Sequence, residues 1–319
     1  MQHERLTLAI DIGGTRYRVG LVTRAGELTG RVEGRTQSGA REAPTLERVL
    51  RTARAALAEA ADQLQVVAVG VGVPGPVDPW TGIVKTPPNL PAWHNLRLKE
   101  VVERELGLPC YVGNDANLAA LGEYRYGAGQ GLQHMVYLTL STGIGGGIIT
   151  DGRLLVGATG LAGELGHISV DLRGPRCGCG NLGCVEALAS GSAIARRAVD
   201  AMEHGEASAL RGRRPVTSER VFDAAQAGDA LSRRIIQEAA EALGVGIVNM
   251  VHTFNPQRVV LGGGVANRWH MWYPTVRRLV WQRTMDGFLE GFSLTPALLA
   301  DDSGLLGAGA YAFESLEEG

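Results

Sequence analysis

The sequence predicts an α/β protein with two domains and a cleft between them, and three observations support this prediction. The chain has 319 residues, more than the ~250–300 residues beyond which one hydrophobic core usually divides. Apolar runs with strand spacing alternate with helical patterns along the chain. Segments 6–30 and 136–157 both fit the order strand, glycine turn, strand, short turn, strand. This repeat indicates two domains of like fold, and two unrelated hairpins are the alternative.

Each element follows from local spacing. Hairpin turns are indicated at 24–26 (RAG) and 151–152 (DG), inside the two repeats. Apolar residues at helical spacing predict a helix over 44–64, and the run VVAVGVGV predicts a buried strand over 66–73. The later elements follow from the same criteria: helices over 96–106, 116–127, 186–204, 217–250, 266–284 and about 305–317, and strands over 109–115 and 257–265.

Composition and charge exclude several classes of partner. The formal net charge is −2 and the isoelectric point is about 6.4, so the chain lacks the basic surface that binds nucleic acid or an anionic membrane. No apolar run reaches 18 residues, and the first residues pass into a strand pattern without the apolar region of a signal peptide. We therefore expect a cytoplasmic protein with no nucleic-acid or membrane partner.

Glycine is the compositional outlier, with 45 of 319 residues, about twice the usual ~7%. The glycines gather at 11–15 (DIGGT), 141–147 (STGIGGG) and 262–264 (GGG), each directly after a short apolar run. A strand that ends in a glycine turn brings backbone N–H groups close together, and such groups bind phosphate. Three such turns predict a phosphate-binding protein.

The familiar phosphate-binding motifs are missing. The sequence has no Gly-Lys dipeptide and only two lysines, Lys85 and Lys99, so a Walker A loop is excluded. The segment DIGGTR does not match the dinucleotide-binding glycine pattern, and a strand rather than a helix follows it. Phosphates must therefore be held by backbone amides, a metal ion and Arg16.

Three of the four cysteines, Cys177, Cys179 and Cys184, follow His167 closely. Three thiolates and an imidazole can close a tetrahedral site for structural Zn²⁺. Three small buried thiols are the alternative, because this spacing is not the common double C-x2-C pattern. The remaining Cys110 has no partner for a disulfide framework, which fits a reducing compartment. Acidic residues at 164 and 186 flank the ligands, which predicts a substrate pocket against the metal.

Asp115, in the segment GNDAN, is the candidate general base. It follows a predicted strand, and open α/β sheets carry their chemistry at the carboxyl ends of strands. The alternative is that Asn114 or Asp115 only caps the helix that begins at Ala116, a common role for these residue types.

Taken together, these segments resemble the ROK family of sugar kinases, within the actin-like ATPase superfamily. The match runs from Asp11 to at least Gly264 and rests on DIGGT, GVPGPVD, PPNLPAW, GNDAN, STGIGGG, GELGH, CGCGNLGCVE and GGGV. It is strongest to the bacterial glucokinases of that family. The resemblance implies a two-domain actin-like ATPase (ribonuclease H-like) fold with an interdomain cleft. The expected domains are a small one, 1–116 joined by the last helix at 305–319, and a large one, 117–304, with the zinc site.

The resemblance also implies site residues. The expected nucleotide site has Asp11 ordering the Mg²⁺ of ATP, the adenosine at the third glycine run, and phosphate contacts from both domains: Gly13, Gly14, Thr15, Thr142, Gly143, Gly262, Gly263 and Gly264. Arg16 stands where the family usually has lysine. The expected sugar pocket consists of Gly75, Asn89, Asn114, Asp115, Glu164, His167 and Glu186, and the expected zinc ligands are His167, Cys177, Cys179 and Cys184.

The implied function is an ATP-dependent hexose kinase that phosphorylates the 6-hydroxyl of glucose, in glycolysis, as a homo-oligomer (dimer or tetramer). N-acetylmannosamine or another hexose is the alternative substrate, and a non-catalytic sugar sensor is the alternative class. Repressors of the same family carry a DNA-binding helix-turn-helix ahead of the kinase-like core. Because DIGGT begins at residue 11, we expect no such module here.

Overall fold

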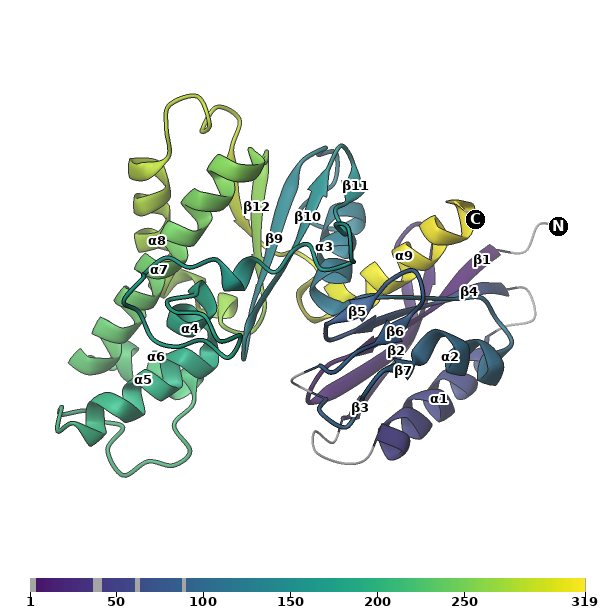
Figure 1. Ribbon diagram of the computed structural model, residues 1–319, viewed down its shortest axis with the longest axis horizontal. Coiled ribbons are helices and arrows are strands. Elements are labelled where there is room, and N and C mark those ends of the chain that lie inside the picture. Colours follow the sequence, from purple (N-terminus) through teal and green to yellow (C-terminus); the bar gives the residue numbers. More distant parts are fainter. Residues whose placement is uncertain (1–3, 37–41, 61–63, 88–89, 319) are drawn as a thin grey trace. The chain divides into compact units, whose positions relative to one another are not determined.

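The computed structural model describes residues 4–36, 42–60, 64–87 and 90–318 (Figure 1). By packing, the chain divides into two compact units. Unit 1 comprises Met1–Gly131, Gly147–Gly163 and Leu298–Gly319, and unit 2 comprises Leu132–Gly146 and Glu164–Ala297. Among the residues described, no helix is long and apolar enough to cross a membrane.

Unit 1 is built on a five-stranded sheet with the strand order β3-β2-β1-β4-β8. The central strand β1 pairs antiparallel with β2 and parallel with β4, and β4 pairs parallel with β8. The strands are β1 (Glu4–Ile12), β2 (Arg16–Thr23), β3 (Leu28–Arg35), β4 (Leu64–Val73) and β8 (Cys110–Asn114). The short strands β5 (Val77–Asp78), β6 (Ile83–Val84) and β7 (Leu96–Arg97) form a separate small sheet.

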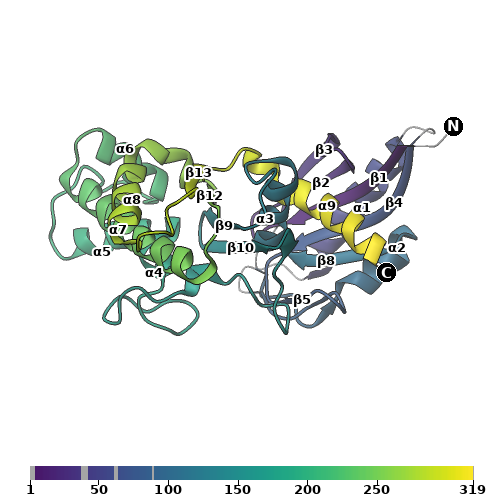
Figure 2. The ribbon, with the colours of Figure 1, turned by 90° about the horizontal axis from the view of Figure 1, so that it is seen from above.

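Helices cover both faces of this sheet. Successive residues of β1 point to opposite sides, so they contribute to two separate cores. Leu8 and Ile10 belong to a core shared with α1 (Glu42–Glu59) and α2 (Leu98–Leu106). Ala9 belongs to a second core with α3 (Asp115–Tyr126) and α9 (Ser303–Glu318). Figure 1 shows α1 and α2 on one face and α9 on the other, and Figure 2 shows α9 lying over the sheet.

The second five-stranded sheet has the order β11-β10-β9-β12-β13. Its strands are β9 (Met135–Leu140), β10 (Ile144–Thr150), β11 (Arg153–Leu154), β12 (Arg258–Gly262) and β13 (Ser293–Pro296). The two sheets have the same strand order, in which β9, β10 and β11 correspond to β1, β2 and β3. The strands β12 and β13 correspond to β4 and β8, and β12 is parallel to both β9 and β13. The predicted internal repeat is confirmed, and the alternative of two unrelated hairpins is wrong.

The helices of unit 2 pack around one long helix, α7, which contacts α4, α5, α6 and α8. Their bounds are α4 (Val185–Ala189), α5 (Gly191–Glu203), α6 (Ser218–Gln226), α7 (Ala230–Phe254) and α8 (Trp269–Arg283). Short 3₁₀ turns precede α4, α8 and α9 at Leu165–His167, Ala266–Arg268 and Ala300–Asp302.

Several predicted helices divide where a polar side chain caps a new helix. The helix predicted over 186–204 is α4 and α5, because Ser190 accepts a hydrogen bond from the Ala193 N–H and caps α5. The helix predicted over 217–250 is α6 and α7, because Asp229 caps α7 in the same way. The helix predicted over 44–64 ends at Glu59, and Leu64 already belongs to β4. The strands β5, β6, β7 and β13 were not predicted, since they are only two to four residues long.

Packing assigns α3 to unit 1, whereas the sequence places a domain boundary after residue 116. Helix α3 packs along α9, and the fully buried Glu123 of α3 contributes specific bonds to this packing. Its carboxylate accepts hydrogen bonds from the Leu299 N–H at 2.8 Å, the Leu298 N–H at 3.1 Å and the Ser303 hydroxyl at 2.8 Å. These bonds tie α3 to the beginning of α9. The domains 1–116 with 305–319 and 117–304 stay a prediction.

Candidate active site and metal centre

Three parallel strands of the first sheet end at one edge, and polar residues lie there. The register pairs Asp11 of β1 with Gly72 of β4, and Gly72 with Gly113 of β8. A Cβ on Gly72 would lie 3.6 Å from Asp11 Oδ1 and 3.7 Å from the Cα of Asp115. Because Gly72 has no side chain, a gap about the size of one methyl group is left between the Asp11 carboxylate, Leu118 and the start of α3. Such an edge is the usual ligand site of an open α/β sheet.

Asn114 and Asp115 begin α3, and both accept hydrogen bonds from its first N–H groups. Asn114 Oδ1 accepts from the N–H groups of Ala116 and Asn117, each at 3.0 Å. Asp115 Oδ1 accepts from the Ala116 N–H at 2.8 Å. The capping interpretation is therefore confirmed for Asn114. It does not remove Asp115 as a base, because a helix N-terminus stabilises the anionic form of a carboxylate, the form that accepts a proton.

The first glycine turn joins β1 to β2. It is closed by a hydrogen bond from the Gly13 N–H to the Arg16 carbonyl at 2.8 Å, and it contains Gly14 and Thr15. The predicted phosphate contact Arg16 is exposed and donates to Glu33 at 3.0 Å. The buried Asp11 carboxylate instead accepts from Arg18 Nη1 at 3.0 Å. Burial raises the pKa of Asp11, and the Arg18 guanidinium opposes this shift.

The second glycine turn is held by α5. The carbonyl of Ser141 accepts from the Gly191 N–H at 2.8 Å, and the carbonyl of Thr142 accepts from the Ser192 N–H at 3.2 Å. Gly143 follows, and a Cβ there would lie 2.6 Å from Glu186 Oε2, so a side chain at this position would displace the Glu186 carboxylate. The turn is thus fixed by the residues around it.

The third glycine run follows β12, beside β9. Gly263 has φ of +87°, and a Cβ there would lie 2.4 Å from the Leu140 carbonyl oxygen. A Cβ on Gly262 would lie 2.5 Å from the Tyr137 hydroxyl. A Cβ on Gly264, in contrast, would meet none of the described atoms within 4 Å. Only glycine fits the first two positions, while the third opens onto free space.

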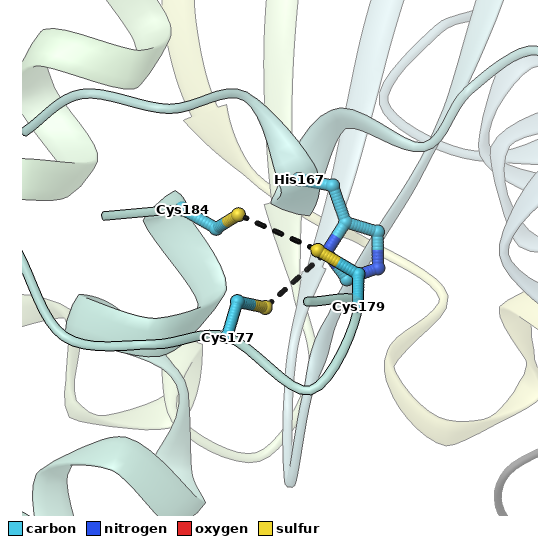
Figure 3. A group of neighbouring side chains, drawn as sticks. All are labelled: His167, Cys177, Cys179 and Cys184. Atoms are coloured by element: carbon cyan, nitrogen blue, oxygen red, sulfur yellow. Dashed lines mark hydrogen bonds between the residues drawn. The ribbon is translucent and has the colours of Figure 1, made fainter. Parts of the chain in front are cut away.

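His167, Cys177, Cys179 and Cys184 converge as predicted (Figure 3). Their ligand atoms all lie within 4.8 Å of one another. Cys177 Sγ lies 3.6 Å from His167 Nδ1, and Cys179 Sγ lies 3.7 Å from Cys184 Sγ. Tetrahedral zinc with ordinary bond lengths places two sulfurs about 3.8 Å apart and a sulfur and a nitrogen about 3.6 Å apart. These two distances therefore match tetrahedral coordination, and the other pairs of ligand atoms lie within 4.8 Å.

The charge of the cluster depends on whether a cation is bound. Burial raises the pKa of Cys177 and raises the pKa of Cys184 to about 12, so both thiols stay protonated unless a positive charge is near. The backbone N–H of Asn181 lowers the pKa of the exposed Cys179. A metal ion supplies the charge that would convert all three thiols to thiolates.

The two ring nitrogens of His167 face different partners. Nδ1 faces Cys177 Sγ, and Nε2 lies 3.7 Å from Glu164 Oε2, too long for a direct hydrogen bond. If Nδ1 binds a metal, Nε2 carries the proton and is a donor. His167 Nε2 and the half-exposed carboxylate of Glu164 then form a neighbouring donor and acceptor pair.

The other predicted sugar residues lie in three places. Glu186, in the first turn of α4, uses Oε2 to accept from the Ile144 N–H at 2.9 Å. Gly75 lies between β4 and β5, in the same unit as Asn114 and Asp115. Asn89 lies outside the described residues. Sequence reasoning missed Arg18 beside Asp11, although strand alternation places Arg16 and Arg18 on one face of β2.

Comparisons with known proteins agree on one family. The model of the ROK family matches residues 7–314. A glucokinase of Thermotoga maritima is 35% identical over 97% of this chain and 98% of its own length. An N-acetylmannosamine kinase of Yersinia pestis is 36% identical over 97% of this chain and 99% of its own length. The crystal structure of a ROK hexokinase from Thermus thermophilus matches with a TM-score of 0.82 and 36% identity, over 98% of this chain and 100% of that one.

Proposed function

The chain belongs to the ROK family and has its actin-like ATPase fold, as the sequence predicted, and from this premise we propose that it is an ATP-dependent kinase for the 6-hydroxyl of glucose. One observation supports the proposal most directly. Asp115, a carboxylate at the end of a parallel strand, shares that edge of the sheet with the buried carboxylate of Asp11. Phosphoryl transfer requires a base for the acceptor hydroxyl and a carboxylate for the metal of the nucleotide.

Asp115 would accept the proton of the sugar hydroxyl while the hydroxyl oxygen attacks the γ-phosphorus of ATP. The bond between that phosphorus and the bridging oxygen of ADP breaks in the same step. Because this transition state is loose, positioning and charge neutralisation supply most of the rate. The hydrogen bond from the Ala116 N–H fixes Asp115 Oδ1 and thereby orients the carboxylate.

The nucleotide would be held by backbone groups and by Asp11. Bound Mg²⁺ neutralises charge on the phosphates. Asp11 fits a role as its ligand, since it is a buried carboxylate at a strand end with Oδ1 facing the gap at Gly72. The predicted contacts of Thr142 and Gly143 with phosphate, and of the open Gly264 with adenosine, remain part of this proposal.

His167 Nδ1 and the three thiolates would hold a structural Zn²⁺. The Cys177–His167 and Cys179–Cys184 distances fit tetrahedral coordination. The ion would fix the tautomer of His167 and leave Nε2–H to donate to a sugar hydroxyl beside Glu164. Polar groups that must be paired in this way select against sugars that lack the matching hydroxyl.

The test is a coupled assay of ADP release with ATP and Mg²⁺, with glucose, mannose and N-acetylmannosamine as acceptors. We expect glucose to give the highest kcat/KM. N-acetylmannosamine is the second candidate, because an N-acetylmannosamine kinase is as similar to this chain as the glucokinase is. Tight sugar binding without ADP release would instead indicate a sugar sensor.

A further inference from the structure

Three charged residues lie side by side on β1, β2 and β3. The register pairs Asp11 with Arg18, and Arg18 with Glu33. Arg18 Nη1 donates to Asp11 Oδ2 at 3.0 Å, and Arg18 Nε lies 3.5 Å from Glu33 Oε2. The guanidinium therefore lies between two carboxylates and contacts both.

Burial distinguishes Arg18 from the other arginines of this cluster. Its side chain is 18% exposed and that of Asp11 is 12% exposed, whereas Arg16 is 58% exposed. Arg16 and Arg31 both contact Glu33, but neither forms an ion pair with Asp11 among the described residues. The Arg18–Asp11 pair is partly removed from solvent, so it is screened less than a surface ion pair.

The carboxylate of Asp11 packs closely against α9. A Cβ on Gly304, in the first turn of α9, would lie 3.2 Å from Oδ2 and 3.3 Å from Oδ1, so the carboxylate packs directly against that turn. Oδ2 faces Arg18, and Oδ1 faces the gap at Gly72. A carboxylate held on one side by a helix turn and bonded at one oxygen has little freedom to rotate.

We propose that Arg18 is a positioning residue of the nucleotide site: it occupies Asp11 Oδ2 and thereby presents Oδ1 to the metal ion of Mg²⁺–ATP. The inference rests on the proposed function, because Mg²⁺–ATP is the ligand concerned. The sequence predicted that Arg16 is the arginine of this site and contacts phosphate. The proposal instead makes Arg18 the arginine that serves the nucleotide site. The action is indirect, since Arg18 works through Asp11 and not through the phosphates.

The experiment is a calorimetric titration of ADP into the protein, with Mg²⁺ and with EDTA, so that the readout is binding and not activity. Arg18→Gln should weaken ADP binding about tenfold with Mg²⁺, the scale of one lost charge-assisted hydrogen bond. With EDTA, its ADP affinity should equal that of the wild type. Arg18→Lys should recover part of the loss. Arg31→Gln, which removes another arginine from Glu33, is the matched control and should bind like the wild type.

Other outcomes have defined meanings. A loss in Arg18→Gln that persists in EDTA means that Arg18 contacts phosphate directly, and the positioning role is wrong. An unchanged affinity with Mg²⁺ also overturns it. In the double variant Asp11→Asn/Arg18→Gln, the loss of ADP affinity with Mg²⁺ should not exceed that of Asp11→Asn alone. Arg18 acts only through Asp11, so once Asp11 is changed the second substitution has nothing further to remove. If the wild-type protein binds no Mg²⁺–ADP at all, the proposed function fails, and this inference fails with it.

Discussion

The carboxylate of Glu186 accepts a hydrogen bond from the backbone N–H of Ile144 at 2.9 Å, and this bond joins the first turn of α4 to the second glycine turn. The other oxygen, Oε1, lies 3.8 Å from Cys177 Sγ. Glu186 therefore connects a predicted phosphate-binding turn with the ligand cluster. A residue that the sequence assigned to the sugar also has a structural task.

This double task can be separated by two substitutions. Glu186→Ala removes the acceptor of the Ile144 N–H, and we expect the free energy of unfolding to fall by about 1–2 kcal/mol. Glu186→Gln keeps an acceptor oxygen and should lose less. Thermal denaturation of both variants measures this difference. If Glu186→Ala is as stable as Glu186→Gln, the hydrogen bond to Ile144 contributes nothing, and the residue serves the substrate alone.

Asp115→Asn should fold and bind sugar but lose at least ~10²-fold in kcat, the usual scale for a lost general base. Amide and carboxylate have nearly the same shape, so the hydrogen bond from the Ala116 N–H is kept. The control is Asn114→Ala, which removes the helix cap and should lower stability by ~1 kcal/mol. Near-normal turnover of Asp115→Asn would reassign Asp115 to helix capping.

The parts of this site that could be predicted from the sequence are those whose residues lie close together in the chain. The His167 and cysteine cluster was found because all four ligands lie within residues 167–184, and the glycine turns were found because each directly follows an apolar strand. The Asp11–Arg18–Glu33 row was missed, because it depends on the pairing register of three strands. That register shifts within β2 between Val19 and Leu21.

Glu123 shows the same limit over a longer separation. Its carboxylate accepts from Leu299 and Ser303, which are 176 and 180 residues away in the chain. Nothing in the local pattern of α3 distinguishes this glutamate from a solvated one. The helix divisions at Ser190 and Asp229 were missed for a different reason, because the prediction followed apolar spacing across them. In the structure, Ser190 and Asp229 cap new helices, and Gly228, with φ of +100°, separates α6 from α7.

The metal is tested by elemental analysis, which should find about one zinc per chain. Cys179→Ser should lower the melting temperature and the sugar affinity together, because His167 belongs to the same cluster. Cys110→Ala is the matched control, since this buried cysteine lies outside the cluster. Zinc should dissociate as pH falls, because protons compete for the thiolates. Metal-free protein with full activity and stability would contradict the assignment.

Asp229 should make the free energy of unfolding depend on pH in the acidic range. Burial acts to raise the pKa of this carboxyl, but hydrogen bonds from the Ala209 N–H and from Ser232 outweigh it and hold the pKa below its ordinary value. A lowered pKa in the folded state adds stability above the unfolded value of about 3.9. This contribution is lost as pH falls through the folded pKa.

Asp229→Asn keeps one acceptor oxygen but cannot ionise. Denaturant unfolding at pH 7 and at pH 3 should therefore show a smaller loss of stability with acid in the variant than in the wild type. The difference between the two proteins should be largest at pH 7. Equal acid sensitivity would show that other carboxyls dominate the acid limb.

Substrate preference is the last prediction, and sequence identity does not decide it, because the glucokinase and the N-acetylmannosamine kinase relatives are 35% and 36% identical to this chain. We expect glucose to be preferred over mannose and over N-acetylmannosamine. His167 Nε2 lies 3.7 Å from Glu164 Oε2, and the two side chains form a compact polar pair suited to one hydroxyl group. An N-acyl group is larger and would require an apolar or amide partner that this pair does not offer. The measurement is kcat/KM for the three sugars, since this ratio reports differential binding of the transition state. If N-acetylmannosamine gives the highest ratio, the chain remains a sugar kinase, and the assignment to glucose is wrong.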